Sequence, residues 1–176
     1  TFVGQTIKLG ANITLNEGDA STWRTNAPKK VWTPIGKWTS QFAGTFDGQG
    51  YTISGVYLKT NTSYGGLFGV TAEGSLLKNF KLVNSYFENN SGGDAAIMGG
   101  IVGRALGNIS GVYNSAIIVS NARIVGGFVG QVWTAPISIT NSQFAGKIYM
   151  EDGNGFYAGG FVGEQRAGGT TMEHCL

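Results

Sequence analysis

The apolar residues of this chain fall in short runs separated by glycine, asparagine, serine and aspartate. Runs such as residues 51–57 and 116–119 are rich in isoleucine, valine, tyrosine and threonine, which suit a pleated strand. The residues between the runs are turn formers. No apolar stripe keeps helical spacing over three turns, and each of the 30 glycines would cost a helix interior about 1 kcal/mol relative to alanine. The pattern therefore predicts short strands joined by tight turns.

One phrase of two glycines, two apolar residues and a further glycine occurs four times, which indicates a repeated structural unit. The second glycines of successive copies are 34, 27 and 33 positions apart, so the units share a core and differ in their loops. We expect these side-chain-free positions to let neighbouring units approach closely. The structural glycines of the phrase are Gly65, Gly66, Gly69, Gly99, Gly100, Gly103, Gly126, Gly127, Gly130, Gly159, Gly160 and Gly163.

A second phrase follows each glycine phrase, and it consists of an apolar residue with a small or polar turn former two places later. The apolar positions are Leu77, Ile109, Ile139 and Met172. The turn formers are Asn79, Gly111, Asn141 and His174. Because glycine and histidine replace asparagine in two copies, an unbroken ladder of stacked asparagines is not expected.

Short strands in units of about thirty residues suit a propeller, a sandwich or a β-solenoid. The Trp-Asp ending of propeller blades is absent. In a solenoid, equivalent residues of successive coils lie over one another at about 4.8 Å. A position that requires glycine in one coil therefore requires it in every coil. Parallel crossovers favour a right-handed path. We therefore predict an all-β fold, a right-handed parallel β-helix (β-solenoid) of irregular repeats of 27–34 residues, with these apolar side chains pointing inward: Phe68, Val102, Val129 and Val162.

The phrase Gly-Gly-(Leu/Ile/Phe)-(Phe/Val)-Gly, followed by an Ile-x-Asn-like element, resembles the GLUG repeat. Residues 4–15, 32–36 and 42–53 are similar to the segment that commonly precedes such repeats. The resemblance covers nearly the whole chain. It implies part of a large bacterial surface or secreted protein, a class that includes some immunoglobulin-A-cleaving metallopeptidases, and it implies a stalk, spacer or display surface rather than one activity.

By length the chain is one domain. We expect residues 1–176 to form a single β-solenoid fragment, with a lead-in or cap-like segment and first coils over 1–60 and four glycine-phrase repeats over 61–176. The chain opens inside a repeat-like lead-in and stops within the second phrase. We therefore expect it to be covalently part of a larger chain.

Composition narrows the partners and the compartment. The net charge is +2 and the 12 basic residues form no run, so no nucleic-acid partner is expected. No segment has the ~20 apolar residues of a membrane span. The single cysteine, Cys175, has no internal disulfide partner, and an interior or semi-interior position of the repeat is expected for it. An extracellular or cell-surface location is expected.

Many parallel β-helices cleave acidic polysaccharides, which requires paired carboxylates, or basic residues and a metal. The local acid pairs, Glu17 with Asp19 and Glu151 with Asp152, lie beside turn formers and are interpreted as solvated loops. His174 is the only histidine, and in a strand it points away from its neighbour Cys175. No catalytic residue, cofactor or metal is predicted.

The candidate ligand-binding residues are the four tryptophans: Trp23, Trp32 and Trp38 in the first quarter of the chain, and Trp133 in an apparent loop. Exposed indoles beside polar groups can stack on sugar rings. The favoured interpretation of the first three is that they cover the open end of the solenoid, because terminal coils need atypical covering residues.

The leading functional hypothesis is a non-catalytic repeat scaffold or spacer of a bacterial cell-surface or secreted protein, of adhesin-like character. One alternative is a module that binds carbohydrate or a host ligand, through the tryptophans or along a long side of the rod. The other is a polysaccharide-cleaving β-helix enzyme.

Overall fold

The computed structural model describes residues 1–91, 93, 96–151 and 157–176. In these ranges the chain consists of short strands and one turn of 3-10 helix, η1 (Ala20–Thr22). All pairings between these strands are parallel. No helix of the described ranges has the length and apolarity needed to cross a bilayer.

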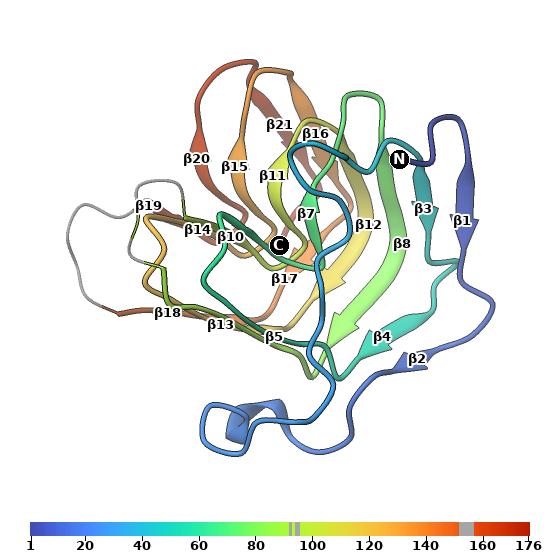
Figure 1. Ribbon diagram of the computed structural model, residues 1–176. Coiled ribbons are helices and arrows are strands. Elements are labelled where there is room, and N and C mark those ends of the chain that lie inside the picture. The colour runs from blue at the N-terminus through green and yellow to red at the C-terminus, as the bar shows by residue number, and fades with distance from the viewer. Residues whose placement is uncertain (92, 94–95, 152–156) are drawn as a thin grey trace.

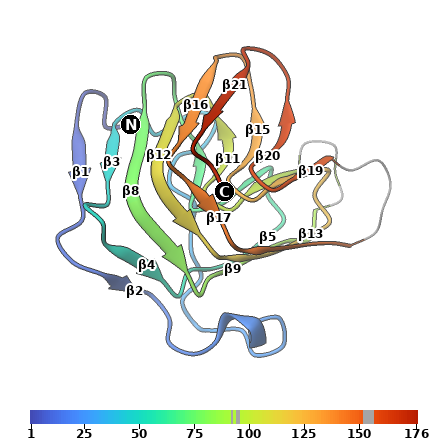
Figure 2. The ribbon, with the colours of Figure 1, turned by 180° about the vertical axis from the view of Figure 1, so that it is seen from behind.

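The strands form four sheets, which the chain visits in a fixed order once per coil (Figures 1 and 2). Sheet 1 has nine strands: β1 (Thr6–Lys8), β2 (Ile13–Thr14), β3 (Thr45–Asp47), β4 (Thr52–Ser54), β8 (Leu76–Val83), β12 (Asn108–Asn114), β16 (Ile137–Thr140), β17 (Gln143–Phe144) and β21 (Thr170–Glu173). Sheet 2 has four: β5 (Tyr57–Thr60), β9 (Tyr86–Asn89), β13 (Ile117–Ser120) and β18 (Lys147–Met150).

Sheets 3 and 4 complete each coil before the chain returns to sheet 1. Sheet 3 contains β6 (Tyr64–Gly65), β10 (Ile97–Gly99), β14 (Ile124–Gly126) and β19 (Tyr157–Gly159). Sheet 4 contains β7 (Phe68–Val70), β11 (Val102–Ala105), β15 (Val129–Val132) and β20 (Val162–Gln165). The expected fold class, an all-β parallel solenoid, is confirmed.

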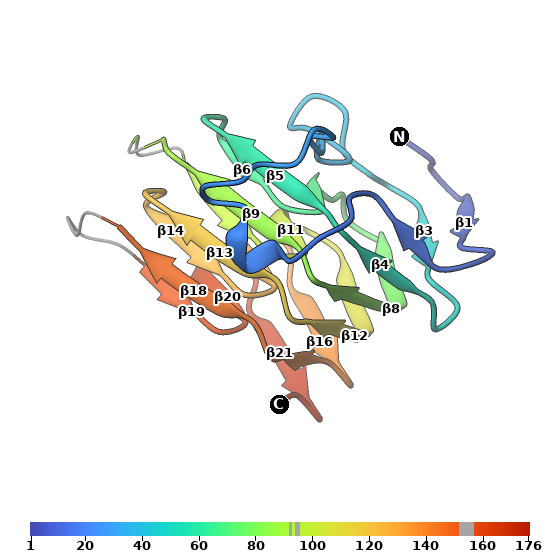
Figure 3. The ribbon, with the colours of Figure 1, turned by 90° about the horizontal axis from the view of Figure 1, so that it is seen from below.

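Equivalent residues of successive coils lie in columns, and Figure 3 shows the coils stacked in chain order from blue to red. The apolar residues of the second phrase form one column in sheet 1, and Phe46 of β3 extends it by one coil. Each member pairs with the next: Phe46, Leu77, Ile109, Ile139 and Met172. Residues at the same position of the sequence repeat therefore pair with one another in the sheets.

The glycine phrase connects sheet 3 to sheet 4. In the last three copies the register follows the phrase, because Gly99 pairs with Gly126 and Gly126 with Gly159. The first copy differs on one side, since Gly65 of β6 lies opposite Met98 rather than Gly99. The register is restored in β7. A one-residue slip in this corner therefore separates the first coil from a perfect repeat.

The two apolar residues of each phrase both face the core. Phe68, Val102 and Val129 are fully buried, as expected, and Val162 is partly buried against them. The preceding residues are buried as well: Leu67, Ile101 and Phe128. Both can point inward because the chain turns a corner between two sheets at this point, so the alternation of a straight strand does not apply.

The turn formers of the second phrase bend sheet 1. Asn79, Gly111, Asn141 and His174 have φ values of 56°, 65°, 49° and 51°. Glycine adopts this left-handed conformation freely, and asparagine and histidine adopt it more readily than most other residues do. In β8 the bend places Leu77 and Phe80 inward with Lys78 and Asn79 between them, so the strand continues around the core.

Replacing Asn141 with valine should lower the free energy of unfolding by about 1–2 kcal/mol, because a β-branched residue is strained at positive φ. Asn141→Gly is the matched control, and it should stay within about 0.5 kcal/mol of the parent because glycine adopts this conformation freely. Urea denaturation of both variants measures the difference. Equal stabilities for the two variants would contradict the assignment of Asn141 to a left-handed bend.

Candidate functional site

The structure separates the tryptophans of the first quarter. Trp23 is only 3% exposed and packs against Tyr57 and Tyr86 on the outside of sheet 2. Trp32 is half-buried at the N-terminal end of the core, and its Nε1 donates to the Leu67 carbonyl (3.0 Å). Trp32 therefore takes the covering role expected for the end of the solenoid, whereas Trp23 packs on the solenoid wall.

Trp38 and Trp133 belong to one surface cluster that also contains Tyr64, Arg104 and Arg166. Trp38 is 46% exposed and lies 6.4 Å from both the Tyr64 ring and the Trp133 ring. The Arg104 guanidinium lies over all three rings, at 4.1–5.1 Å from their centroids, and Arg166 lies 5.1 Å from Trp133. We call these five residues the aromatic–arginine cluster.

Polar residues of sheet 4 hold the cluster in place. Arg104, Gln131 and Glu164 occupy equivalent positions on β11, β15 and β20. Arg104 Nε donates to Gln131 Oε1 (2.8 Å), Gln131 donates to Glu164, and Arg166 forms an ion pair with Glu164 (3.5 Å). Arg104 is 8% exposed, and burial lowers the pKa of its guanidinium below the ordinary value. Its charge is therefore used within the protein rather than offered to solvent.

A groove opens beside this cluster and is called here the N-terminal groove. Its volume is about 710 Å³. One wall is the segment 32–40, and the other is β5, β6 and the connection between them, residues 58–64. The segment lies along the outer edge of β7, where Ile35 forms a bridge with Phe68. Along β5 it makes one backbone hydrogen bond, from Trp32 N to the Tyr57 carbonyl (2.7 Å).

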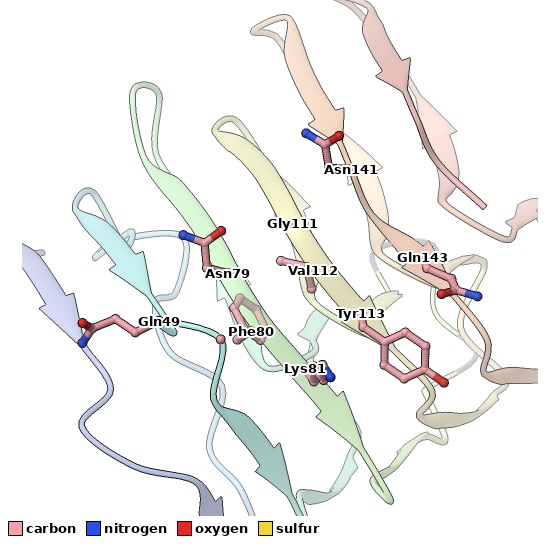
Figure 4. Close-up of a pocket in the computed structure, with 10 residues that line it drawn as sticks. Gln49, Asn79, Phe80, Lys81, Gly111, Val112, Tyr113, Asn141 and Gln143 are labelled. Atoms are coloured by element: carbon pink, nitrogen blue, oxygen red, sulfur yellow. The ribbon is translucent and has the colours of Figure 1, made fainter.

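A second groove follows the bend of sheet 1 and has a volume of about 690 Å³ (Figure 4). Its lining includes the bend residues Asn79, Gly111 and Asn141. A further row of polar side chains comes from successive strands: Lys81, Tyr113 and Gln143. Because the bend repeats in each coil, this groove runs across the strands, along the stack.

Neither groove has an aspartate or glutamate in its lining. Asp19 caps η1 by accepting from Ser21 N (2.9 Å), and Glu151 forms an ion pair with Arg24. Asp152 lies outside the described residues. The carboxylate pair that glycoside hydrolysis requires is therefore not present in either groove.

The next question is whether side chains that could bind a metal ion or act as a nucleophile lie close together. Within the described ranges, no three His, Cys, Asp or Glu side chains gather around a common point. His174 is exposed, whereas Cys175 packs against the core and its Sγ lies 3.3 Å from the Ile139 carbonyl. The two neighbours thus point to different sides, and Cys175 takes the partly interior position expected from the repeat.

Glu88 is the most enclosed carboxylate that the structure describes in detail, with 6% exposure on the outer face of sheet 2. It accepts from Tyr86 (2.9 Å) and Asn90 (2.9 Å) and pairs with Lys59 (2.8 Å). Burial alone raises the pKa of Glu88, but the hydrogen bonds and the Lys59 charge outweigh it and lower the pKa below its ordinary value of 4.5. These contacts join β5 to β9.

We expect the protein to lose stability as the pH falls below about 4.5, because Glu88 then binds a proton more readily in the unfolded chain than in the folded one. A carboxyl with a lower pKa in the folded chain stabilises above its unfolded pKa, and this contribution disappears through the folded pKa. Glu88→Gln should make the free energy of unfolding fall less steeply with decreasing pH. Asp19 and Asp47, whose pKa values are also lowered, should account for the pH dependence that remains.

Chemical denaturation between about pH 3 and pH 7 measures the profile, with Glu73→Gln as a control at an exposed glutamate. The parent and Glu73→Gln should share one profile. If Glu88→Gln follows that same profile, the Glu88 contacts do not contribute as described.

The sequence contains a signal for the cluster that its tryptophans alone do not reveal. Arg104, Gln131 and Glu164 each come directly after the third glycine of a phrase. Once the phrases are stacked, these polar residues must lie side by side. Tyr64 precedes the first phrase directly and reaches the same surface because the chain turns the corner between sheets 3 and 4 there.

Comparison with known proteins yields two partial similarities. No family model matches the chain, so the resemblance to GLUG repeats stays a prediction, and no solved structure matches it. A relative from Evansella cellulosilytica, named as a Gly-rich membrane protein, is 37% identical over 82 residues, or 46% of this chain and 9% of the relative. Halomucin of Haloquadratum walsbyi is 32% identical over 131 residues, or 73% of this chain and 1% of halomucin. The chain therefore resembles a small part of two much longer proteins.

Proposed function

We propose that this chain is a non-catalytic repeat scaffold of a bacterial cell-surface or secreted protein, with an adhesin-like role for the whole. The observation that carries the proposal is the stacking of glycine-phrase coils in register, which gives each coil the same shape and the same contact with the next. Such a unit can be repeated to make a rod of any length.

Two further features support a scaffold. The strands of all four sheets run across the stack, so backbone hydrogen bonds connect each coil to its neighbours on every side. The names of the two relatives are not those of enzymes, and one of them includes the word membrane. A GLUG-type repeat in a surface protein would need this combination of stiffness and chemical inertness.

Surface labelling combined with an activity assay tests the proposal. Antibodies against the purified chain should label intact cells of the organism that encodes it, without permeabilisation. The purified chain should release neither reducing ends nor unsaturated uronates from a panel of neutral and acidic polysaccharides. Labelling that requires permeabilised cells would contradict the location, and a released product would contradict the non-catalytic role.

A further inference from the structure

The N-terminal groove presents one tryptophan at the tip of a tight turn. Lys37 and Ser40 exchange backbone hydrogen bonds (3.1 and 2.9 Å), so residues 38 and 39 form a two-residue turn. This turn projects Trp38 into the lining of the groove. Trp38 is the one tryptophan among the large apolar side chains of the described residues that are exposed to solvent.

The Trp38 ring is fixed before any ligand arrives. It lies near Tyr64 at an interplanar angle of 28° and meets Trp133 edge-on at 87°. Arg104 lies over the same ring at 5.1 Å and is itself held by Gln131. An exposed ring held by groups from three separate coils loses little freedom on binding, which favours affinity.

The rest of the lining is rich in hydroxyl groups. Both walls contribute them: Thr33, Thr39 and Ser40 from one, and Thr60, Thr62 and Ser63 from the other. Lys37 and Lys59 supply the positive charge of the lining, although Lys59 is already paired with Glu88 (2.8 Å), and the lining itself contains no carboxylate. In the described part of the chain, no strand pairs with the groove-side edges of β5 and β6, so backbone groups there face the groove.

We propose that the N-terminal groove binds an extended oligosaccharide, with one sugar ring stacked on Trp38. A pyranose ring has an apolar C–H face, which matches an indole, and a rim of hydroxyls, which matches serine, threonine and backbone partners. The Thr60 and Thr62 hydroxyl groups bond to each other (2.9 Å), and an apolar ligand would shut the other hydroxyl groups of the lining off from water. A nucleic acid would require more than two lysines, since phosphates dominate its affinity.

The tryptophan emission of the chain provides the first readout, because a sugar stacked on the half-exposed Trp38 indole changes the surroundings of one of its four tryptophans. The intact chain is titrated with cello-, xylo-, manno-, laminari- and galacturono-hexasaccharides, and with a thymidine dodecanucleotide for comparison. At least one saccharide should change the fluorescence saturably. Calorimetry with the same saccharide should show Trp38→Ala weakening binding by about tenfold or more.

Two variants separate binding from folding. Ser63→Arg fills the groove from an exposed position outside the aromatic–arginine cluster, and it should weaken binding as Trp38→Ala does. Tyr149→Ala removes a 50% exposed aromatic ring from β18, at the opposite edge of sheet 2 from β5, and should bind as the parent does. Thermal melting checks that all three variants fold.

The proposal is overturned if none of the saccharides binds, if only the oligonucleotide binds, or if folded Trp38→Ala and Ser63→Arg bind like the parent. Any of these results would leave the scaffold role intact, since that role does not depend on the groove.

Discussion

Replacing Gly127 with alanine is expected to lower the free energy of unfolding by more than about 2 kcal/mol, while the same change at Gly160 should cost less than about 1 kcal/mol. Both residues are the second glycine of their phrase. A Cβ on Gly127 would lie less than 3.0 Å from the Gly160 carbonyl oxygen and 2.8 Å from the Phe144 ring. A Cβ on Gly160 would meet one atom only, at 3.9 Å.

The pair isolates the cause of the effect. Neither glycine has a positive φ, so the difference cannot come from backbone preference. It comes from the coil that lies against Gly127, which can move away only by giving up its hydrogen bonds. Equilibrium unfolding in urea measures both variants. Similar losses at the two positions would show that close approach between coils is not the reason for the glycine.

Replacing Asn114 with alanine should cost about 3 kcal/mol, because two buried backbone groups lose their partners. Asn114 is fully buried at the end of β12. Its Nδ2 donates to the Gly127 carbonyl (2.6 Å), and its Oδ1 accepts from Ala116 N (3.0 Å). Asn114 is fully shielded from solvent, so bulk water does not contact these two backbone groups in the folded chain.

Asn108→Ala is the matched control on the same strand. Asn108 also accepts from a backbone amide, Ser138 N (2.8 Å), but it is exposed. Water can take over that bond, so the loss should stay below about 1 kcal/mol. Thermal and urea unfolding measure the free energy of unfolding of both variants. If Asn114→Ala lowers it no more than Asn108→Ala does, the buried hydrogen bonds of Asn114 do not stabilise the fold as described.

The sequence predicted the fold through its repeated phrases. Glycines that recur before two apolar residues can only reflect a repeated close approach, and Gly126 and Gly159 do lie beside Gly99 and Gly126 in the sheet. The slip at Gly65 was beyond prediction, because the phrase itself is intact there. Its position next to Met98 depends on how the first coil meets the next.

The candidate site was less accessible to sequence reasoning. Trp38 and Trp133 are 95 positions apart, and their contact depends on the path of the segment that precedes the first full coil. The chain from Ile35 to Phe42 runs along β7 through two isolated bridges, Ile35 to Phe68 in β7 and Phe42 to Thr71 directly after it, and no sequence repeat predicts these bridges. Asn114 was equally hidden, since it shares a column with Leu82 and Phe144, where an apolar residue is the natural expectation.

The central claim is that equivalent residues of successive coils face one another in register, and paired cysteines test it most directly. In a Cys175→Ser background, Ser110→Cys with Thr140→Cys should form a disulfide readily, because these residues pair and their hydroxyl oxygens are 2.8 Å apart. Ser110→Cys with Ser138→Cys, on the same face but two residues out of register, should not, since its Cα atoms would be about 8 Å apart. Intact-mass measurement under mild oxidation should detect the disulfide in the first pair only; a disulfide that forms equally well or better in the second pair would contradict the stacking of the coils.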